Sequence, residues 1–244
     1  MSPNATELDI VDGNVQNGAK DQSFSAPQEK VALKAVRSVT TLVTHMLVGI
    51  VVGICVWYAL RFGLPLTTTL LHILLCVIGF QLLMAESILA LAPDSWLSNM
   101  KLKHKRLIHW VMQIGGSVVA IVGCILMSLS KSINFNTLHG QFALVSMVFT
   151  VASLLNGLTS LYAYELRKYI PGILSRLTHI CFGIVAFATA SISLCYGIDK
   201  GGFRNWATTQ FADALIVMTA IFTVIIIINP FVTFFNKFRG AVSN

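Results

Sequence analysis

The chain has 244 residues, of which 55% are hydrophobic and only 11% are charged, and its formal net charge is +7. A soluble domain usually carries about 25% charged residues, so this composition excludes an ordinary soluble fold. The positive charge argues little for nucleic-acid binding, because the basic residues lie in short segments between long uncharged stretches. We therefore expect an integral membrane protein.

Six apolar stretches follow a polar N-terminal segment, residues 1–34, for which we predict a disordered tail. Each stretch is long enough to cross about 30 Å of hydrocarbon, which takes roughly 20 residues in a helix. Because unpaired backbone groups are not tolerated in lipid, each span must be helical. Pro65, Pro93, Pro171 and Pro230 are expected at span ends, where a missing amide costs least. The predicted spans are 38–60, 67–92, 107–130, 138–161, 176–197 and 211–234.

The predicted fold class is all-α, a polytopic six-transmembrane-helix bundle over residues 35–236, with a short tail at 237–244. The lysines and arginines give its orientation. If the N-terminus lies in the cytosol, thirteen of the seventeen fall in segments on the cytosolic side. Since positive charge is retained on that side, we predict that both termini are cytosolic.

Four histidines in the predicted spans form two pairs by depth. His72 and His139 lie near the outer starts of spans two and four, whereas His109 and His179 lie near the cytosolic starts of spans three and five. An ionisable side chain in a span is costly and marks a functional site. Two neutral imidazoles that face each other between helices form the axial clamp of a haem iron. The pattern predicts two b-type haems between the four central helices.

Two other interpretations of these histidines stay open at this stage. They are suited to relay protons in an ion- or substrate-coupled transporter, or they belong to a haem-free scaffold. His104 lies in a basic loop and is expected to be solvated. His45 is expected to hydrogen-bond within the bundle or to a haem propionate. Glu86, a carboxylate well inside a span, either orients a histidine on the cytosolic side or lies at the interface.

The cysteines all fall singly within predicted spans, and no paired metal-binding motif occurs. We predict that they are packing residues, with neither a disulfide nor a thiolate metal site. Without a C-x-x-C-H motif, any haem is held non-covalently. The five are Cys55, Cys76, Cys124, Cys181 and Cys195.

The segments around the paired histidines read Leu71-His72, Ile108–Gln113, Leu138–Gln141 and Thr178-His179. Together with the six-span plan, they resemble the cytochrome b561 family over about residues 35 to 240. The segments Leu83–Ser87 and Ala92–Ser95 resemble in particular the animal cytochrome b561 domain-containing transmembrane reductases.

The resemblance implies a di-haem oxidoreductase of the endoplasmic reticulum or another endomembrane. Its donor is cytosolic ascorbate, and its acceptor on the far side is monodehydroascorbate radical or ferric iron. The family's ligands in spans two and four fall on His72 and His139, and those in spans three and five fall on His109 and His179. Whether the protein forms a homodimer is left open. The family's ascorbate-binding basic residues correspond to Lys103, Lys105, Arg106, Arg167 and Arg176.

Overall fold

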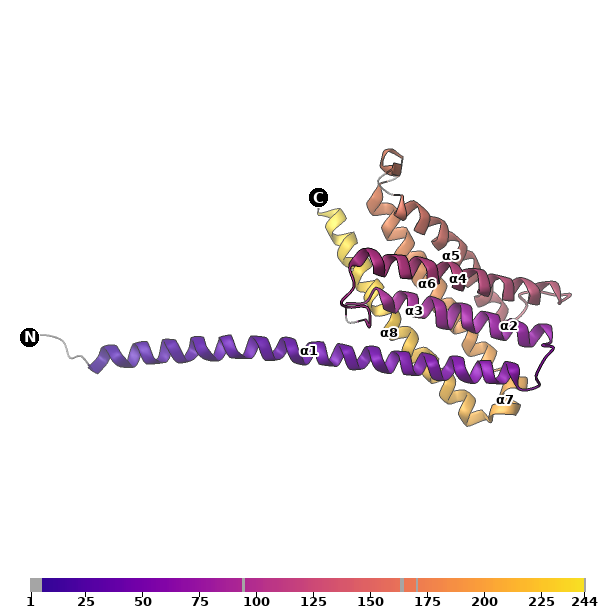
Figure 1. The fold of residues 1–244 in the computed structure, drawn as a ribbon, viewed down its shortest axis with the longest axis horizontal. Coiled ribbons are helices and arrows are strands. Elements are labelled where there is room, and N and C mark those ends of the chain that lie inside the picture. The colour runs from indigo at the N-terminus through magenta and orange to yellow at the C-terminus, as the bar shows by residue number, and fades with distance from the viewer. Residues whose placement is uncertain (1–5, 94, 163–164, 170, 244) are drawn as a thin grey trace, which may run out of the picture. The chain divides into compact units, whose positions relative to one another are not determined.

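The computed structural model describes residues 6–93, 95–162, 165–169 and 171–243, with side chains described from residue 31 onward except at 166 and 167. Over these residues the chain consists of helices and connecting loops (Figure 1). It forms two compact units, one up to residue 42 and one from residue 43. Six helical segments of the described chain are long and apolar enough to cross a membrane, which confirms the all-α, six-span prediction. They are Val31–Leu60, Thr68–Ala90, Leu102–Leu129, Leu138–Leu161, Gly172–Ile198 and Thr209–Val242.

The first helix, α1 (Thr6–Leu60), begins within the segment for which we expected a disordered tail. Residue 34 is therefore not a helix boundary in the structure. Extending a helix that has already formed costs much less than nucleating one, so a polar segment can continue an apolar span. In the second unit, α1 contributes Val48, Val51 and Cys55 to the hydrophobic core.

The second span consists of three segments rather than one regular helix. It starts as α2 (Thr68–Cys76), continues as the π-helix η1 (Val77–Met84) and ends as α3 (Ala85–Ala90). The Thr67 hydroxyl caps α2 by accepting the amide of Leu70 at 3.4 Å. A π-helical turn adds a residue to a helix and is often found at functional sites.

The remaining spans are single α-helices. Helix α4 packs on α2 and η1, α5 packs on α6, and α6 also packs on α8. The Thr137 hydroxyl caps α5 by accepting the amide of Gly140, just before that helix presents His139. The elements after α3 are α4 (Leu102–Leu129), α5 (Leu138–Leu161), η2 (Glu165–Lys168), α6 (Gly172–Ile198), α7 (Gly201–Ala207) and α8 (Thr209–Val242).

The last helix differs from the prediction at its C-terminal end. Pro230 lies inside α8 rather than at a span end, and the helix continues to Val242 through the predicted tail at 237–244. Proline is tolerated within membrane helices, where neighbouring groups and local adjustments satisfy the carbonyl that it leaves unpaired. A proline near the end of an apolar stretch therefore did not mark the helix boundary here.

The short helix α7 was not predicted, and ion pairs join it to the end of α6 and to α8. Arg204 contacts Asp199 at 2.6 Å and Asp213 at 2.7 Å. Hydrogen bonds to Asp213 and Asp199 raise the pKa of the Arg204 guanidinium above its ordinary value. These contacts close the connection between α6 and α8 at the bundle end that also holds the start of α5.

Glycines bring the second span and α4 into backbone contact. A Cβ added to Gly79 would lie 2.6 Å from the carbonyl oxygen of Gly116 and 2.7 Å from the Cβ of Ala120. A Cβ added to Gly116 would lie 2.8 Å from the carbonyl oxygen of Gly79. Close approach through small residues is the usual way in which membrane helices pack.

We expect Gly79→Ala to lower the free energy of unfolding by about 1–3 kcal/mol, because the added methyl overpacks a backbone contact. Gly49→Ala is the matched control, since nothing lies within 4 Å of the Cβ that it adds. That variant should be as stable as the parent or slightly more stable, because alanine favours helix over glycine. Thermal unfolding in one detergent measures both, and equal midpoints would contradict the contact.

Candidate functional site

The structure brings the four paired histidines together as the sequence predicts. The ring centroids of His72 and His139 are 6.1 Å apart, with planes at 87°. Those of His109 and His179 are 6.3 Å apart, with planes at 88°. All four rings are half-buried. The bundle therefore holds two similar imidazole pairs, each formed by side chains from two different spans.

Each of these rings hydrogen-bonds through Nδ1 to a backbone carbonyl of an adjacent helix. His139 binds the carbonyl of Ser193 at 2.8 Å, and His179 binds that of Ser153 at 2.9 Å. A carbonyl oxygen only accepts, so Nδ1 must carry the proton. Nε2 of each neutral ring is thereby left with its lone pair, the form in which imidazole ligates a metal.

The other two rings make the same kind of bond between the second span and α4. His72 on α2 donates to the carbonyl of Gly123 at 3.0 Å, and His109 on α4 donates to that of Ser87 at 2.9 Å. The exchange is reciprocal, because each span of a pair supplies one histidine and one acceptor carbonyl. The second span and α4 form one exchanging pair, and α5 and α6 form the other.

A constant sequence spacing underlies this reciprocity. In three of the four spans, the interval between the histidine and the acceptor residue that follows it has the same length. The interval runs from His109 to Gly123, from His139 to Ser153 and from His179 to Ser193. At a rise of about 1.5 Å per residue, the histidine and the acceptor residue of one span lie about 21 Å apart along the α-helix. The two histidine pairs therefore lie at two different levels of the bundle. Each span thus carries a histidine at one level and the acceptor for its neighbour's histidine at the other.

The second span departs from this spacing by one residue, and η1 explains the difference. The interval from His72 to Ser87 is one residue longer than the interval in the other three spans. The π-helix η1 (Val77–Met84) lies between them. A π-helical turn absorbs one extra residue without changing the register of the helix on either side. Ser87 therefore reaches His109 at the same level at which Ser153 reaches His179.

Serine and glycine residues also fit around two of the rings. The Ser193 hydroxyl donates to the carbonyl of His139 at 2.9 Å, and a Cβ added to Gly197 would lie 3.3 Å from Cε1 of the same histidine. A Cβ added to Gly157 would likewise lie 3.3 Å from Cε1 of His179. Each ring therefore sits against a serine and a glycine four residues apart on the facing helix.

His45 and Glu86 form a separate hydrogen-bonded pair. Nδ1 of His45 lies 2.8 Å from Oε1 of Glu86, which immediately precedes Ser87. Nε2 of His45 is buried and has no hydrogen-bond partner among the described residues. The expectation that His45 bonds within the bundle is confirmed, and Glu86 is the partner.

The predicted donor-binding cations differ in exposure. Lys103, Arg106 and Arg176 are exposed, whereas Lys105 is buried and donates to the hydroxyl of Ser95 at 3.4 Å. Arg106 and Arg176 each lie three residues before a ring of the His109–His179 pair, so both are about one turn from that pair. The side chain of Arg167 lies outside the described part of the structure.

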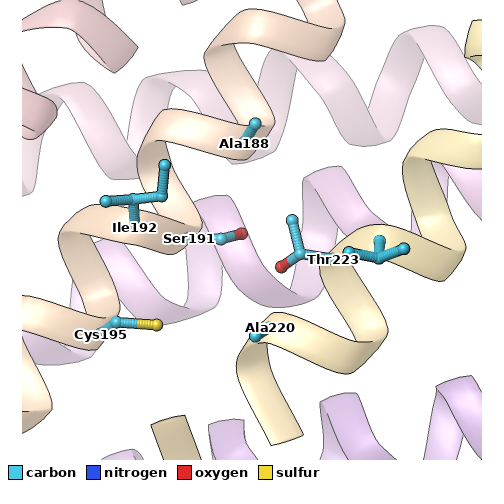
Figure 2. A pocket seen from close by; sticks show the side chains of 7 residues that line it. Ala188, Ser191, Ile192, Cys195, Ala220 and Thr223 are labelled. Atoms are coloured by element: carbon cyan, nitrogen blue, oxygen red, sulfur yellow. The ribbon is translucent and has the colours of Figure 1, made fainter. Parts of the chain in front are cut away.

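One open pocket of about 240 Å³ lies elsewhere, between α6 and α8 (Figure 2). Its walls are apolar or carry small hydroxyl side chains, as at Ser191 and Thr223. None of its lining residues is charged or is one of the paired histidines. It therefore lacks the groups that would bind an anionic donor.

Several features of the site are not apparent from composition or single motifs. The acceptor carbonyls belong to Ser87, Gly123, Ser153 and Ser193. Serine and glycine are common in membrane helices, so these residues do not mark a functional site in the sequence. The only signal that could have found them is the constant spacing after each histidine. Nor does the sequence indicate that Cys76 and Cys124, which lie in different spans, are in contact, with their sulfurs 3.7 Å apart.

Comparison with known proteins gives the family. A family model described as eukaryotic cytochrome b561 matches residues 71–204, which include all four paired histidines. The chain belongs to the cytochrome b561 family. This family binds haem, and the names of its members support a transmembrane oxidoreductase.

Two relatives carry the same name. The chain is 27% identical to "Transmembrane reductase CYB561D2" of Homo sapiens over 214 residues, which cover 85% of the chain and 93% of the relative. It is 30% identical to the Mus musculus protein of the same name over 166 residues, which cover 65% of the chain and 72% of the relative. The predicted membership and reductase class are thus confirmed.

Single-residue deletions can test whether η1 absorbs the extra residue of the second span. Deleting Leu82 should convert η1 to regular α-helix and leave haem content close to that of the parent, because His72 and Ser87 keep their positions. Deleting Val148, which lies between His139 and Ser153, should remove at least half of the haem. In that uninterrupted helix the loss of a residue rotates everything beyond it by about 100°. The haem-to-protein ratio of the purified variants measures both, and equal losses would contradict the role of η1.

Proposed function

We propose that the protein holds two haem b groups non-covalently, one on His72 and His139 and one on His109 and His179. The observation that carries this proposal is the reciprocal bonding of all four rings through Nδ1. It leaves four neutral Nε2 atoms as potential ligands at two levels of the bundle. Haem binding follows from the family, whereas the number of haems and the four histidine ligands are what we propose.

The spacing of the rings supports the assignment. An iron gripped by two imidazoles with metal–nitrogen bonds of about 2 Å requires ring centroids about 6 Å apart, once the size of each ring is added. The observed separations are 6.1 Å and 6.3 Å. If both rings of a pair hold a haem iron, no open position would remain on it, and that would favour electron transfer over oxygen binding.

When bound, each haem supplies a one-electron redox centre, and the chain's own residues set its surroundings. The carbonyls of Gly123 and Ser193 orient the rings of one pair, and those of Ser87 and Ser153 orient the rings of the other. A hydrogen bond to Nδ1 also raises the basicity of Nε2. In this proposal the two levels lie in opposite halves of the membrane.

The proposed donor is ascorbate at the cytosolic end, where the His109–His179 pair lies. Support comes from the charge pattern, which places most lysines and arginines and both terminal segments on the cytosolic side. Arg106 and Arg176 are exposed about one turn from that pair and attract an anionic donor, together with Lys103. Lys105 contributes charge from its buried position beside Ser95, and Arg167 adds a further positive charge.

The proposed acceptor on the opposite side is monodehydroascorbate radical or ferric iron, and the proposed location is the endoplasmic reticulum or another endomembrane. Support for both comes from the resemblance of the chain to the cytochrome b561 domain-containing transmembrane reductases. Residues 1–34 and 237–244 are proposed to be the cytosolic segments that flank the transmembrane domain, 35–236.

Replacing single histidines should separate the two haems. His72→Ala or His139→Ala should remove one component of the reduced-minus-oxidised spectrum and about half of the haem, because one pair loses its clamp. His109→Ala or His179→Ala should remove the other component. His104→Ala, at an exposed position in the first turn of α4, is the control and should keep both. Loss of the same component in His72→Ala and His109→Ala would show that the pairing is wrong.

Reduction of the protein by ascorbate should depend on the exposed cations at one end only. Each exposed charge contributes about 0.2–1 kcal/mol to attracting an anion, so the double variant Arg106→Ala, Arg176→Ala should raise the half-saturating ascorbate concentration roughly 2- to 30-fold. Lys131→Ala removes an exposed charge from the other end and should leave it unchanged. Rapid mixing at low salt measures this, and equal values for all three proteins would rule out the proposed donor site.

A further inference from the structure

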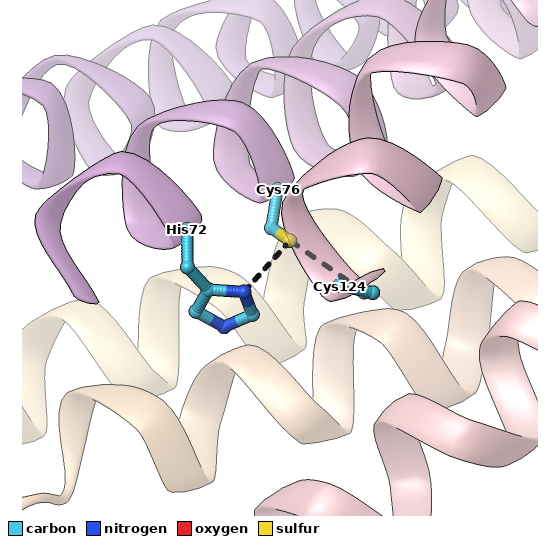
Figure 3. Close-up of side chains that lie close together, drawn as sticks. All are labelled: His72, Cys76 and Cys124. Carbon is cyan, nitrogen blue, oxygen red and sulfur yellow. Dashed lines mark hydrogen bonds between the residues drawn. The ribbon is translucent and has the colours of Figure 1, made fainter. Parts of the chain in front are cut away.

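Cys76 and Cys124 form a thiol pair beside one ring of the His72–His139 pair (Figure 3). Cys76 is the last residue of α2, and Cys124 lies on α4. Their sulfurs are 3.7 Å apart, and the Cys76 sulfur lies 3.4 Å from Nδ1 of His72. In the described part of the chain, all five cysteines are free thiols.

The helices approach closely enough at this level for the two sulfurs to bond. A Cβ added to Gly123, the neighbour of Cys124, would lie 3.0 Å from the Cys76 sulfur and 3.4 Å from the Cys76 amide nitrogen. The backbones of α2 and α4 therefore nearly touch beside the thiols. A disulfide needs a sulfur–sulfur bond of about 2.05 Å, so the gap closes by side-chain rotation with a small helix shift.

A metal ion is a weaker explanation for the cluster. The ligand atoms of His72, Cys76 and Cys124 lie within 4.8 Å of one another. A metal would have to take Nδ1 of His72, but that nitrogen already donates its proton to the carbonyl of Gly123. The two thiols are the groups of this cluster that remain free to react with each other.

We infer that Cys76 and Cys124 are a redox modification site that forms a disulfide when a hydroperoxide oxidises it. One sulfur takes an oxygen atom from the peroxide to form a sulfenic acid, and the peroxide leaves as water or an alcohol. The second sulfur then attacks the first, and water is released. In total, two thiols and one hydroperoxide give one disulfide, one water and one alcohol or second water.

The disulfide would act on the nearby histidine, a consequence that rests on the proposed haem ligation by His72. In the thiol form, the Cys76 sulfur is close enough to share the Nδ1 proton with the Gly123 carbonyl. Drawing that sulfur toward Cys124 weakens the contact and makes His72 a poorer electron donor. The His109–His179 pair has no described cysteine contact of this kind, so only one of the two haem sites would respond.

The test treats the full-length protein in detergent with hydrogen peroxide and counts thiols by alkylation after denaturation. The five alkylatable cysteines should fall to three, and mass spectrometry should find one cross-linked peptide pair that contains Cys76 and Cys124. Cys124→Ala should yield no cross-link. Cys55→Ala, which removes a buried thiol elsewhere, should still lose two thiols.

Redox titration provides the second readout. Peroxide should raise the midpoint potential of the haem component that His72→Ala removes, and it should leave the other component unchanged. Cys124→Ala should show no shift. Retention of all five thiols, oxidation without a cross-link, or a cross-link to another cysteine would overturn the inference. The cross-link is measured without reference to haem, so its absence would leave the proposed haem ligands untouched. A cross-link in protein that lacks both haem components would contradict only the proposed function.

Discussion

The hydrogen bond from a histidine Nδ1 to a carbonyl on the neighbouring helix is the interaction on which the rest of the structure depends. In a membrane a polar ring needs a partner, and few are offered by apolar side chains. A helical carbonyl has a second lone pair that can accept a further donor. Using it satisfies the ring, fixes its tautomer and ties two helices together at a defined depth.

Reciprocity then constrains the four central spans. Because each span supplies a histidine at one level and an acceptor at the other, the distance between them must match in all four. Three spans achieve this with the same length of regular α-helix, and the second span achieves it with one more residue and the π-helix η1. The irregularity of η1 is therefore part of the register, and not a defect in the span. Glycines such as Gly79 and Gly116 let the backbones approach closely enough for these bonds.

The two ends of the bundle share this construction but differ in their surroundings. The His109–His179 end carries exposed arginines one turn away and the His45–Glu86 pair. The other end carries the Cys76–Cys124 thiol pair in contact with His72. The two histidine pairs thus share the same hydrogen-bonded geometry but have different neighbouring side chains.

The sequence by itself determined the membrane class, the six spans and the pairing of histidines, since these follow from charge, length and helix direction. It did not determine that His45 bonds to Glu86, that α8 passes through Pro230 or that Cys76 meets Cys124. Those features depend on which faces of the helices turn toward each other. Hydropathy is nearly uniform around a membrane helix, so it records depth but little about rotation. The acceptor carbonyls were hidden for the same reason, because every residue has one and only packing decides which of them meets a histidine.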